Sequence, residues 1–267
     1  MENICYRTQT PLCIDGRLEE DAWKKAPWSH RFVDVIGGTP ALYDSRAAVL
    51  WDDRCLYVGF WAEEPYPTAT ITQRDGYLWF ENDLEVFIAG EDTYYEFQIS
   101  ARNTVYEVFY IWTDAYQSGG WSSRPEFDVV KNNARVFGGN HDRQGTYFWN
   151  GDHPRGTRWA FLNWDMPGMR SAVSVEGFLN DPSRPSKGWY AEIAFPWEGM
   201  RDLAGGRSLP PKDGDVWSLF LGRYNNLPLN GGHISVGWSW DPVGSDDNHR
   251  PEAFTRFRFS QEYVEDL

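Results

Sequence analysis

An aromatic residue stands beside a run of polar acceptors where Trp79 is followed by Glu81, Asn82 and Asp83. An indole ring can stack on the apolar C–H face of a pyranose while nearby carboxylate and amide groups bond to the sugar hydroxyls. The segment therefore predicts a ligand site where Trp79 adjoins the acceptors Glu81, Asn82 and Asp83. A Trp at the mouth of a strand can equally pack on a neighbouring loop, and the sequence leaves that alternative open.

The same carboxylates suit two other roles. Glu81, Asp83 and Glu85 together could offer oxygens to calcium, although their spacing is not that of an EF-hand. Glycoside hydrolysis needs two carboxylates flanking a bond, and Glu85 with Glu107 is the pair that neighbouring predicted strands offer. The pair would define a hydrolase or lyase acting on a polysaccharide.

Other catalytic signatures are missing from the sequence, which has no nucleophile elbow, P-loop, dinucleotide fingerprint or HExxH motif. A haem-binding sandwich would need axial Met or His ligands, which the 4 Met and 5 His allow without indicating. We therefore expect a binding protein with no catalytic residues of its own and no required cofactor, with calcium as the one ion considered.

Three consecutive strands carry these candidates. The segments 84–88, 95–99 and 105–110 each mix β-branched or aromatic residues with polar ones near period two. The links 89–92 and 100–103 are turn-like and too short for anything except antiparallel neighbours. The stretch predicts a β-meander in which one face stays wet.

Further strands are predicted on both sides of the meander, and helices are scarce. A turn and one or two helical turns are expected over 14–23. The other predicted strands are 46–51, 55–61, 172–178, 188–195, 216–223, 234–240 and 254–259. The pattern predicts an all-β fold, an antiparallel two-sheet β-sandwich with few short helices. Because no linker divides the chain, we expect one domain over residues 1–267.

A long excursion interrupts the strands between Gln117 and Pro167. It is rich in Gly, Asn, Asp, Arg and Trp and is too long for a plain connector in a compact domain. Its large aromatic residues argue against disorder and predict an ordered insertion lying on one face. These aromatic residues are Trp121, Tyr147, Phe148, Trp149, Trp159 and Trp164.

Composition narrows the class of partner. Aromatic residues make up 17% of the chain, with 15 Trp, which is more than one core needs, so some should line a surface. The formal net charge of −14 repels phosphate backbones and anionic lipid heads, so neither nucleic acid nor a membrane is expected as a partner. Cys5, Cys13 and Cys55 have neither zinc-site spacing nor the even number of a disulfide framework.

No apolar run approaches the ~18 residues of a membrane span. The segment 1–3 also lacks the charged and apolar regions of a signal peptide. We therefore expect either a cytoplasmic protein or one whose leader has been removed.

Several segments, in order along the chain, resemble one family. They are Ile14–Gly16 with Trp23, Val49–Asp53 with Leu56–Val58, Asn82–Ile88, Gly188–Trp197, and Trp240–Pro242 with His249–Phe254. Together they resemble the carbohydrate-binding modules of family 9 and the wider group of family-9-like sugar-binding domains. The resemblance covers nearly the whole chain.

The resemblance implies a jelly-roll-like sandwich that grips the reducing-end sugar between two tryptophans. Trp79 looks like the first of these tryptophans and Glu85 like the glutamate of the acidic strand, while Gln98 stands where the modules have an arginine. His249 occupies the place of the second tryptophan, in the loop after the Asp-Pro pair. The implied ligand is an oligo- or polysaccharide, with a glycoside hydrolase as partner and a secreted or periplasmic location.

The remaining candidates are less specific. Asp247 lies in the same loop as His249, and Arg223 on a late strand more often pairs with a carboxylate than meets a ligand. His249 could bond a sugar or serve a structural role. Trp149 and Trp159 could form a second wall of the site, or could bury the excursion against the sandwich, and the second outcome is the one expected.

Overall fold

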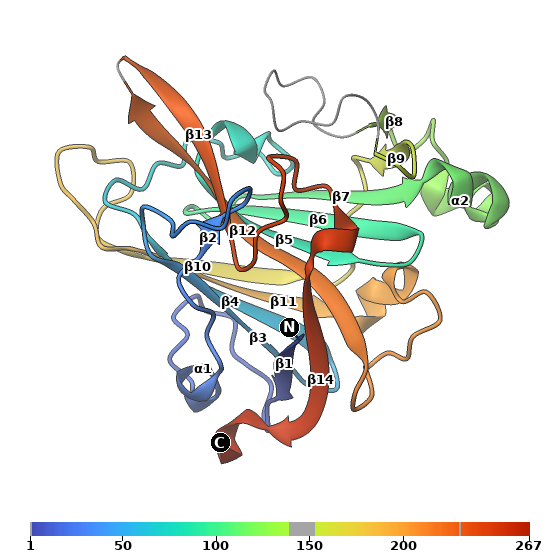
Figure 1. Ribbon diagram of the computed structural model, residues 1–267, viewed down its shortest axis with the longest axis horizontal. Coiled ribbons are helices and arrows are strands. Elements are labelled where there is room, and N and C mark those ends of the chain that lie inside the picture. The colour runs from blue at the N-terminus through green and yellow to red at the C-terminus, as the bar shows by residue number, and fades with distance from the viewer. Residues whose placement is uncertain (1, 139–152, 230) are drawn as a thin grey trace.

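The computed structural model describes residues 2–138, 153–229 and 231–267 (Figure 1). The first seven strands are β1 (Glu2–Arg7), β2 (Val33–Asp34), β3 (Ser45–Trp51), β4 (Cys55–Glu63), β5 (Asp83–Ala89), β6 (Thr93–Ser100) and β7 (Val105–Trp112). The others are β8 (Ala134–Phe137), β9 (Arg158–Phe161), β10 (Arg170–Glu176), β11 (Gly188–Pro196), β12 (Val216–Leu229), β13 (Gly232–Ser239) and β14 (Thr255–Tyr263).

Helices are short, as expected from the sequence. Among the described residues, the two α-helices are α1 (Asp21–Lys25) and α2 (Thr113–Ser118). The 3-10 turns are η1 (Leu78–Phe80), η2 (Trp121–Ser123), η3 (Pro125–Phe127), η4 (Trp197–Leu203), η5 (Pro251–Ala253) and η6 (Val264–Asp266). Within the part of the chain that the structure describes, no helix is long and apolar enough to cross a membrane.

The strands form one continuous mixed sheet, which differs from the two separate antiparallel sheets expected. The hydrogen-bonded order is β10-β11-β4-β3-β1-β14-β12-β5-β6-β7-β9-β8, with β13 paired to β12 and to β2. The sheet is continuous because β1 pairs with two strands. The first residues of β1 pair in parallel with β14, and its last two residues pair in parallel with β3. We call the strands on the two sides of β1 the two arms of the fold: one is β10-β11-β4-β3 and the other is β14-β12-β5-β6-β7-β9-β8. The single strand β1 joins the two arms by hydrogen bonds.

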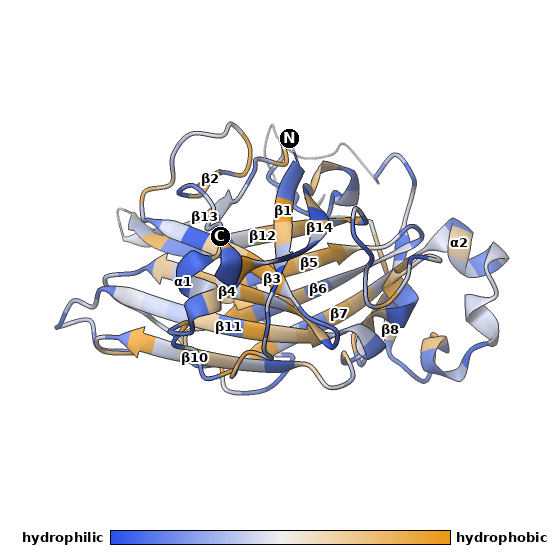
Figure 2. Ribbon diagram, turned by 90° about the horizontal axis from the view of Figure 1, so that it is seen from below, coloured by the Kyte–Doolittle hydropathy of each residue, from blue (hydrophilic) through white to orange (hydrophobic). Residues whose placement is uncertain are grey.

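The two arms nevertheless pack face to face around a shared apolar core. Phe195 on β11 contacts Phe97 on β6, with ring centroids 5.4 Å apart, although several strands separate β11 from β6 in the sheet order. One buried cluster accordingly contains Val58, Val86 and Ile193 from both arms. Figure 2 shows hydrophobic residues concentrated along these strands and polar residues in the connections. The prediction of a mostly β fold is confirmed, with two face-to-face layers formed by one continuous sheet.

The meander appears as predicted, and its register positions the candidate site. β5, β6 and β7 are antiparallel neighbours, and Glu85, Gln98 and Tyr106 stand opposite one another across the three strands. Because side chains alternate between the faces of a sheet, these three residues point to one face while Glu107 points to the other.

The turn at Asp15 and Gly16 is tied to β11 by one buried carboxylate. Glu192 accepts hydrogen bonds from the backbone N–H groups of Asp15 and Gly16 at 3.0 and 3.1 Å, and from Trp23 Nε1 at 2.9 Å. Gly16 has a φ of 79°, and a Cβ there would lie 2.8 Å from the Val173 backbone. The helical turn that follows, α1, begins later than expected from the sequence.

The excursion over 117–167 extends the sheet as well as covering it. β9 pairs with β7, and β8 pairs with β9, so two short strands that weak periodicity concealed lengthen one arm. Trp164 packs on Phe109, with ring centroids 4.7 Å apart. Tyr147, Phe148 and Trp149 lie outside the described residues.

Candidate ligand-binding site

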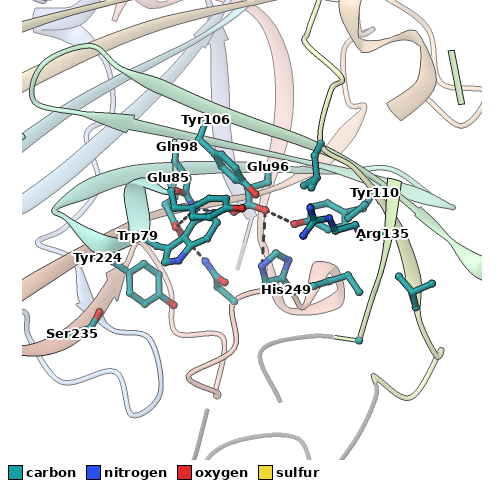
Figure 3. A pocket seen from close by; sticks show the side chains of 17 residues that line it. Trp79, Glu85, Glu96, Gln98, Tyr106, Tyr110, Arg135, Tyr224, Ser235 and His249 are labelled. Carbon is teal, nitrogen blue, oxygen red and sulfur yellow. Dashed lines mark hydrogen bonds and ion pairs between the residues drawn. The ribbon is translucent and has the colours of Figure 1, made fainter. Parts of the chain in front are cut away.

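A cavity of about 560 Å³ opens over the polar face of the meander (Figure 3). That volume falls in the usual range for small-ligand sites. β5 to β7 supply its floor, the β12–β13 hairpin one wall through Tyr224 and Ser235, and β8 and β9 another wall through Phe137 and Ala160. The loop before η5 contributes Asn248 and His249. The position follows from a meander whose face stays uncovered by the other arm.

Two buried carboxylates share one amide at the floor. Gln98 Nε2 donates hydrogen bonds to Glu85 Oε1 at 3.0 Å and to Glu96 Oε1 at 2.8 Å. The outer oxygens are also held, because Asn248 Nδ2 donates to Glu85 Oε2 and the Tyr110 hydroxyl donates to Glu96 Oε2, each at 2.6 Å. The side chains of the floor are thus fixed before any ligand enters.

The floor has an unusual protonation equilibrium at Glu96. Burial away from water, which outweighs the opposing hydrogen bonds from Tyr110 and Gln98 and is aided by the nearby Asp247, raises the pKa of Glu96 to about 7. His249 Nε2 lies 4.0 Å from Glu96 Oε2, and His249 Nδ1 lies 3.1 Å from the Tyr94 hydroxyl. Near neutral pH, Glu96 therefore exists in both charge states.

Trp79 forms an aromatic wall beside this floor. It lies in η1, partly exposed, and its ring stacks on Tyr77 with centroids 4.6 Å apart. On the inner side it meets Tyr106 edge to face, with centroids 5.1 Å apart. Tyr77 is 48% exposed and Phe80 is 70% exposed, so aromatic surface continues from the cavity onto the rim. The candidate platform is present at the place where a ligand would enter.

Four of the predicted contacts line the cavity together: Trp79, Glu85, Gln98 and His249. His249 differs from expectation in being 5% exposed and enclosed by aromatic rings, including Phe137 with centroids 4.6 Å apart. His249 lines the cavity as a buried ring and does not offer an exposed ring face.

Glu81 and Asn82 do not line the cavity and instead shape its surroundings. Glu81 accepts hydrogen bonds from the Thr70 backbone N–H at 2.8 and 2.9 Å. Asn82 accepts from the Asn226 N–H at 2.8 Å and donates to Glu64. Both side chains fix the segments on either side of η1 and β5.

Arg223 and Asp247 are also outside the lining. Arg223 is fully buried, forms an ion pair with Glu64 at 3.0 Å and donates to the Glu63 carbonyl at 2.7 Å. Asp247 is buried and accepts from the His249 N–H at 3.0 Å, which fixes the loop that presents Asn248 and His249.

The three carboxylates considered for calcium each form hydrogen bonds with a different part of the protein. Asp83 is buried and accepts from the Tyr224 N–H at 3.2 Å, Glu81 caps residue 70, and Glu85 belongs to the floor. Burial raises the pKa of Asp83 to about 8. Among residues 2–138, 153–229 and 231–267, no group of three or more His, Cys, Asp or Glu side chains is arranged to hold a metal ion. Cys5, Cys13 and Cys55 are free thiols.

The carboxylate pair considered for hydrolysis does not converge. Glu85 lines the cavity, whereas Glu107 is buried on the opposite face of the sheet, where it accepts from the Tyr95 hydroxyl at 2.5 Å and from the Met166 N–H at 3.0 Å. The alternation of side chains along β7 makes this separation unavoidable.

The lining residues that the sequence did not single out include Glu96, Tyr106, Tyr110 and Asn248. The alternation of side chains along the strands could have identified the first three. Glu96 lies on the same face of β6 as Gln98, Tyr106 is paired with Gln98, and Tyr110 lies on the same face of β7 as Tyr106. Trp159 is absent from the lining and packs near Tyr116, with centroids 5.9 Å apart, as burial of the excursion predicted. Trp149 lies outside the described residues.

Comparison with known proteins bears on the fold. No family model and no curated protein sequence matches the chain. A solved candidate carbohydrate-binding protein of Bacteroides uniformis aligns over 96% of this chain and 97% of its own, with 13% identity and a TM-score of 0.53. A family 9 carbohydrate-binding module of Caldicellulosiruptor kristjanssonii, solved with cellotriose, aligns over 100% of this chain and 97% of its own, with 11% identity and a TM-score of 0.50.

The fold is that of the family 9 carbohydrate-binding modules. At this sequence identity the similarity supports a family-9-like backbone fold and gives no information on individual ligand contacts. The resemblance that the sequence motifs indicated is thus confirmed at the level of fold.

Proposed function

We propose that this protein is a non-catalytic carbohydrate-binding protein or accessory module that holds one sugar of a glycan in the cavity beside Trp79. The observation that carries the proposal is a partly exposed indole placed next to a buried floor of hydrogen-bond acceptors, Glu85 and Glu96. Few other ligands combine an apolar face with a ring of donors at this scale.

The expected binding mode follows from the chemistry of a pyranose. Its C–H face would stack on Trp79 and remove apolar area from water, while its hydroxyls would donate to Glu85 and Glu96. Because Gln98, Asn248 and Tyr110 already fix both carboxylates, little side-chain entropy would be lost on binding.

The finer aspects of the proposal concern architecture and context. The curled sheet would serve as the jelly-roll-like sandwich of an accessory module, and the module would assist a glycoside hydrolase in polysaccharide degradation and carbohydrate catabolism. Cellotriose, which the Caldicellulosiruptor kristjanssonii module binds, is the first ligand to test. We also propose calcium as an optional ligand of Glu81, Asp83 and Glu85. Repeating the sugar-binding calorimetry in the presence of EDTA tests whether calcium contributes.

A hydrolase is the weaker alternative. Retaining glycosidases place their carboxyl groups roughly 5–5.5 Å apart with the scissile bond between them. Glu85 and Glu96 are close, but the Gln98 amide occupies the space between them by bonding to both. A sugar lying above the amide would meet both carboxylates from the same side, which suits binding better than cleavage.

Calorimetry with soluble oligosaccharides tests the proposal. We expect saturable binding that Trp79→Ala weakens and that Phe178→Ala, at an exposed aromatic residue outside the cavity lining, leaves unchanged. Product analysis of the same mixtures should show intact glycan. Efficient cleavage that Glu85→Gln abolishes would favour the hydrolase instead, and an absence of binding across neutral, acidic and amino sugars would refute the proposal.

A further inference from the structure

We infer that the cavity selects glycans carrying a free, positively charged amine, such as 2-amino-2-deoxy sugars, over their neutral and N-acetylated counterparts. The inference rests on the proposed carbohydrate function and specifies its ligand class. The amine would lie on the cavity side of Glu85 and Glu96, above the Gln98 amide that bridges the two carboxylates.

The charge at the floor is the first support. Glu85 and Glu96 are 3% and 4% exposed and both line the cavity. Among the described residues of the lining, Arg135 is the only Lys or Arg side chain, and it lies exposed on β8. A cation on the floor would thus meet two carboxylates, and the arginine of the described lining lies at the solvent-exposed wall.

The balance of donors and acceptors is the second support. Gln98 donates both amide N–H groups to the two carboxylates, and among the described residues its buried Oε1 has no hydrogen-bond partner. At this part of the cavity the floor therefore offers the acceptor oxygens of Glu85 and Glu96, with no amide N–H of Gln98 left over. An ammonium group brings three donors and no acceptor, whereas a hydroxyl brings one donor together with lone pairs that would face the carboxylates.

The aromatic surroundings are the third support. Trp79, Tyr106 and Tyr110 line the cavity around the two carboxylates (Figure 3). A cation near the faces of such rings is attracted by their quadrupoles, and the attraction grows when the cation is desolvated. Rings and carboxylates together form an environment suited to a cation.

The wider electrostatic environment points the same way. Asp247, from the loop before η5, acts electrostatically on Glu96 and adds negative potential to the floor. Burial raises the pKa of Asp83, on β5, to about 8, so Asp83 is mostly neutral at pH 7 and adds little. His249 faces Glu96 from the same loop, and Arg158 on β9 lies behind it, over Tyr94 and Trp112 with one bond to the His249 carbonyl. Arg135 on β8 adds a positive charge at the solvent-exposed wall.

The test uses three trimers that share a β-1,4 backbone and differ at C2: a glucosamine trimer, an N-acetylglucosamine trimer and cellotriose. Calorimetry at pH 7 and low salt should show the glucosamine trimer binding about ten-fold more tightly than either of the others, since charge-assisted hydrogen bonds replace neutral ones. The preference should shrink at 0.5 M NaCl because salt screens the attraction.

Variants locate the preference. Glu96→Gln keeps shape and removes the charge, so the ratio of glucosamine-trimer to cellotriose affinity should fall about ten-fold. Arg135→Gln, at an exposed position, should raise that ratio. Glu198→Gln, on an exposed carboxylate outside the lining, is the matched control and should leave it unchanged.

The outcomes separate this inference from the proposed function. Cellotriose binding as tightly as the glucosamine trimer would overturn the amine preference and leave carbohydrate binding intact. Glucosamine-trimer affinity that neither Trp79→Ala nor Glu96→Gln changes would reveal non-specific attraction to an acidic protein and would also overturn the inference. No binding by any trimer would refute both.

Discussion

Trp79 meets Tyr106 edge to face, with ring centroids 5.1 Å apart and planes 81° apart. The contact joins η1 to β7, so the aromatic wall and the carboxylate floor belong to one rigid unit. The fold therefore sets the distance between the Trp79 ring and the polar side chains of the cavity floor.

Trp79→Ala should weaken sugar binding by about 1–3 kcal/mol, since stacking removes apolar area from water at roughly 25 cal/mol per Å². The fold should survive, because Trp79 is partly exposed, lies outside the central core cluster and packs only against the edge of a second, smaller cluster. Calorimetry measures the first effect and thermal unfolding the second. If the variant melts far below the wild type, Trp79 is chiefly a structural residue.

His249→Ala should act mainly on stability. The imidazole is buried among Phe87, Tyr110 and Phe137, so its removal leaves a cavity in an aromatic cluster. We expect a loss of roughly 1–3 kcal/mol in the free energy of unfolding, measured by urea denaturation. His249→Phe, which fills the space without the polar contacts, separates packing from hydrogen bonding. An unchanged free energy of unfolding in His249→Ala would contradict the packing role.

Arg223→Met should destabilise the fold by about 3–5 kcal/mol, because it leaves Glu64 buried without its ion-pair partner at 3.0 Å. The double variant Arg223→Met with Glu64→Gln should recover part of that loss. Since neither residue lines the cavity, sugar affinity per folded molecule should stay the same. A selective loss of affinity in a stable Arg223→Met protein would return Arg223 to the set of ligand contacts.

The stability of the protein should fall as pH rises from about 4.5 to about 7 through the contribution of Glu96. Burial raises the pKa of Glu96 from its usual value of 4.5 to about 7, so the native state holds that proton more tightly than the unfolded state does. Across this window the unfolded state binds fewer protons, and stability on the order of 3 kcal/mol is lost by neutral pH.

Glu96→Gln removes this contribution. Denaturation series from pH 4 to pH 8 on both proteins should therefore give curves that diverge in that window, with the variant flatter. Parallel curves would show that Glu96 ionises with an ordinary pKa.

The sequence by itself determined the local structure of the chain. Period-two alternation fixed β5, β6 and β7 and their antiparallel order, because short turns leave neighbouring strands no other pairing. The alternating strands and the family-9-like motifs indicated the fold. Trp79 was identified from its position at the mouth of that meander, whereas Glu85 and Gln98 were identified from the resemblance to the family 9 modules.

Only the tertiary structure decided which polar groups meet. Glu81 and Glu96 are both acidic and close to the meander, yet one caps a turn and the other forms the cavity floor. The choice depends on contacts with residues distant in sequence, such as the loop carrying Asn248, and on the way β1 joins the two arms into one curled sheet. Local alternation assigns a side chain to a face, but burial of that face depends on long-range packing, which no short stretch of sequence encodes.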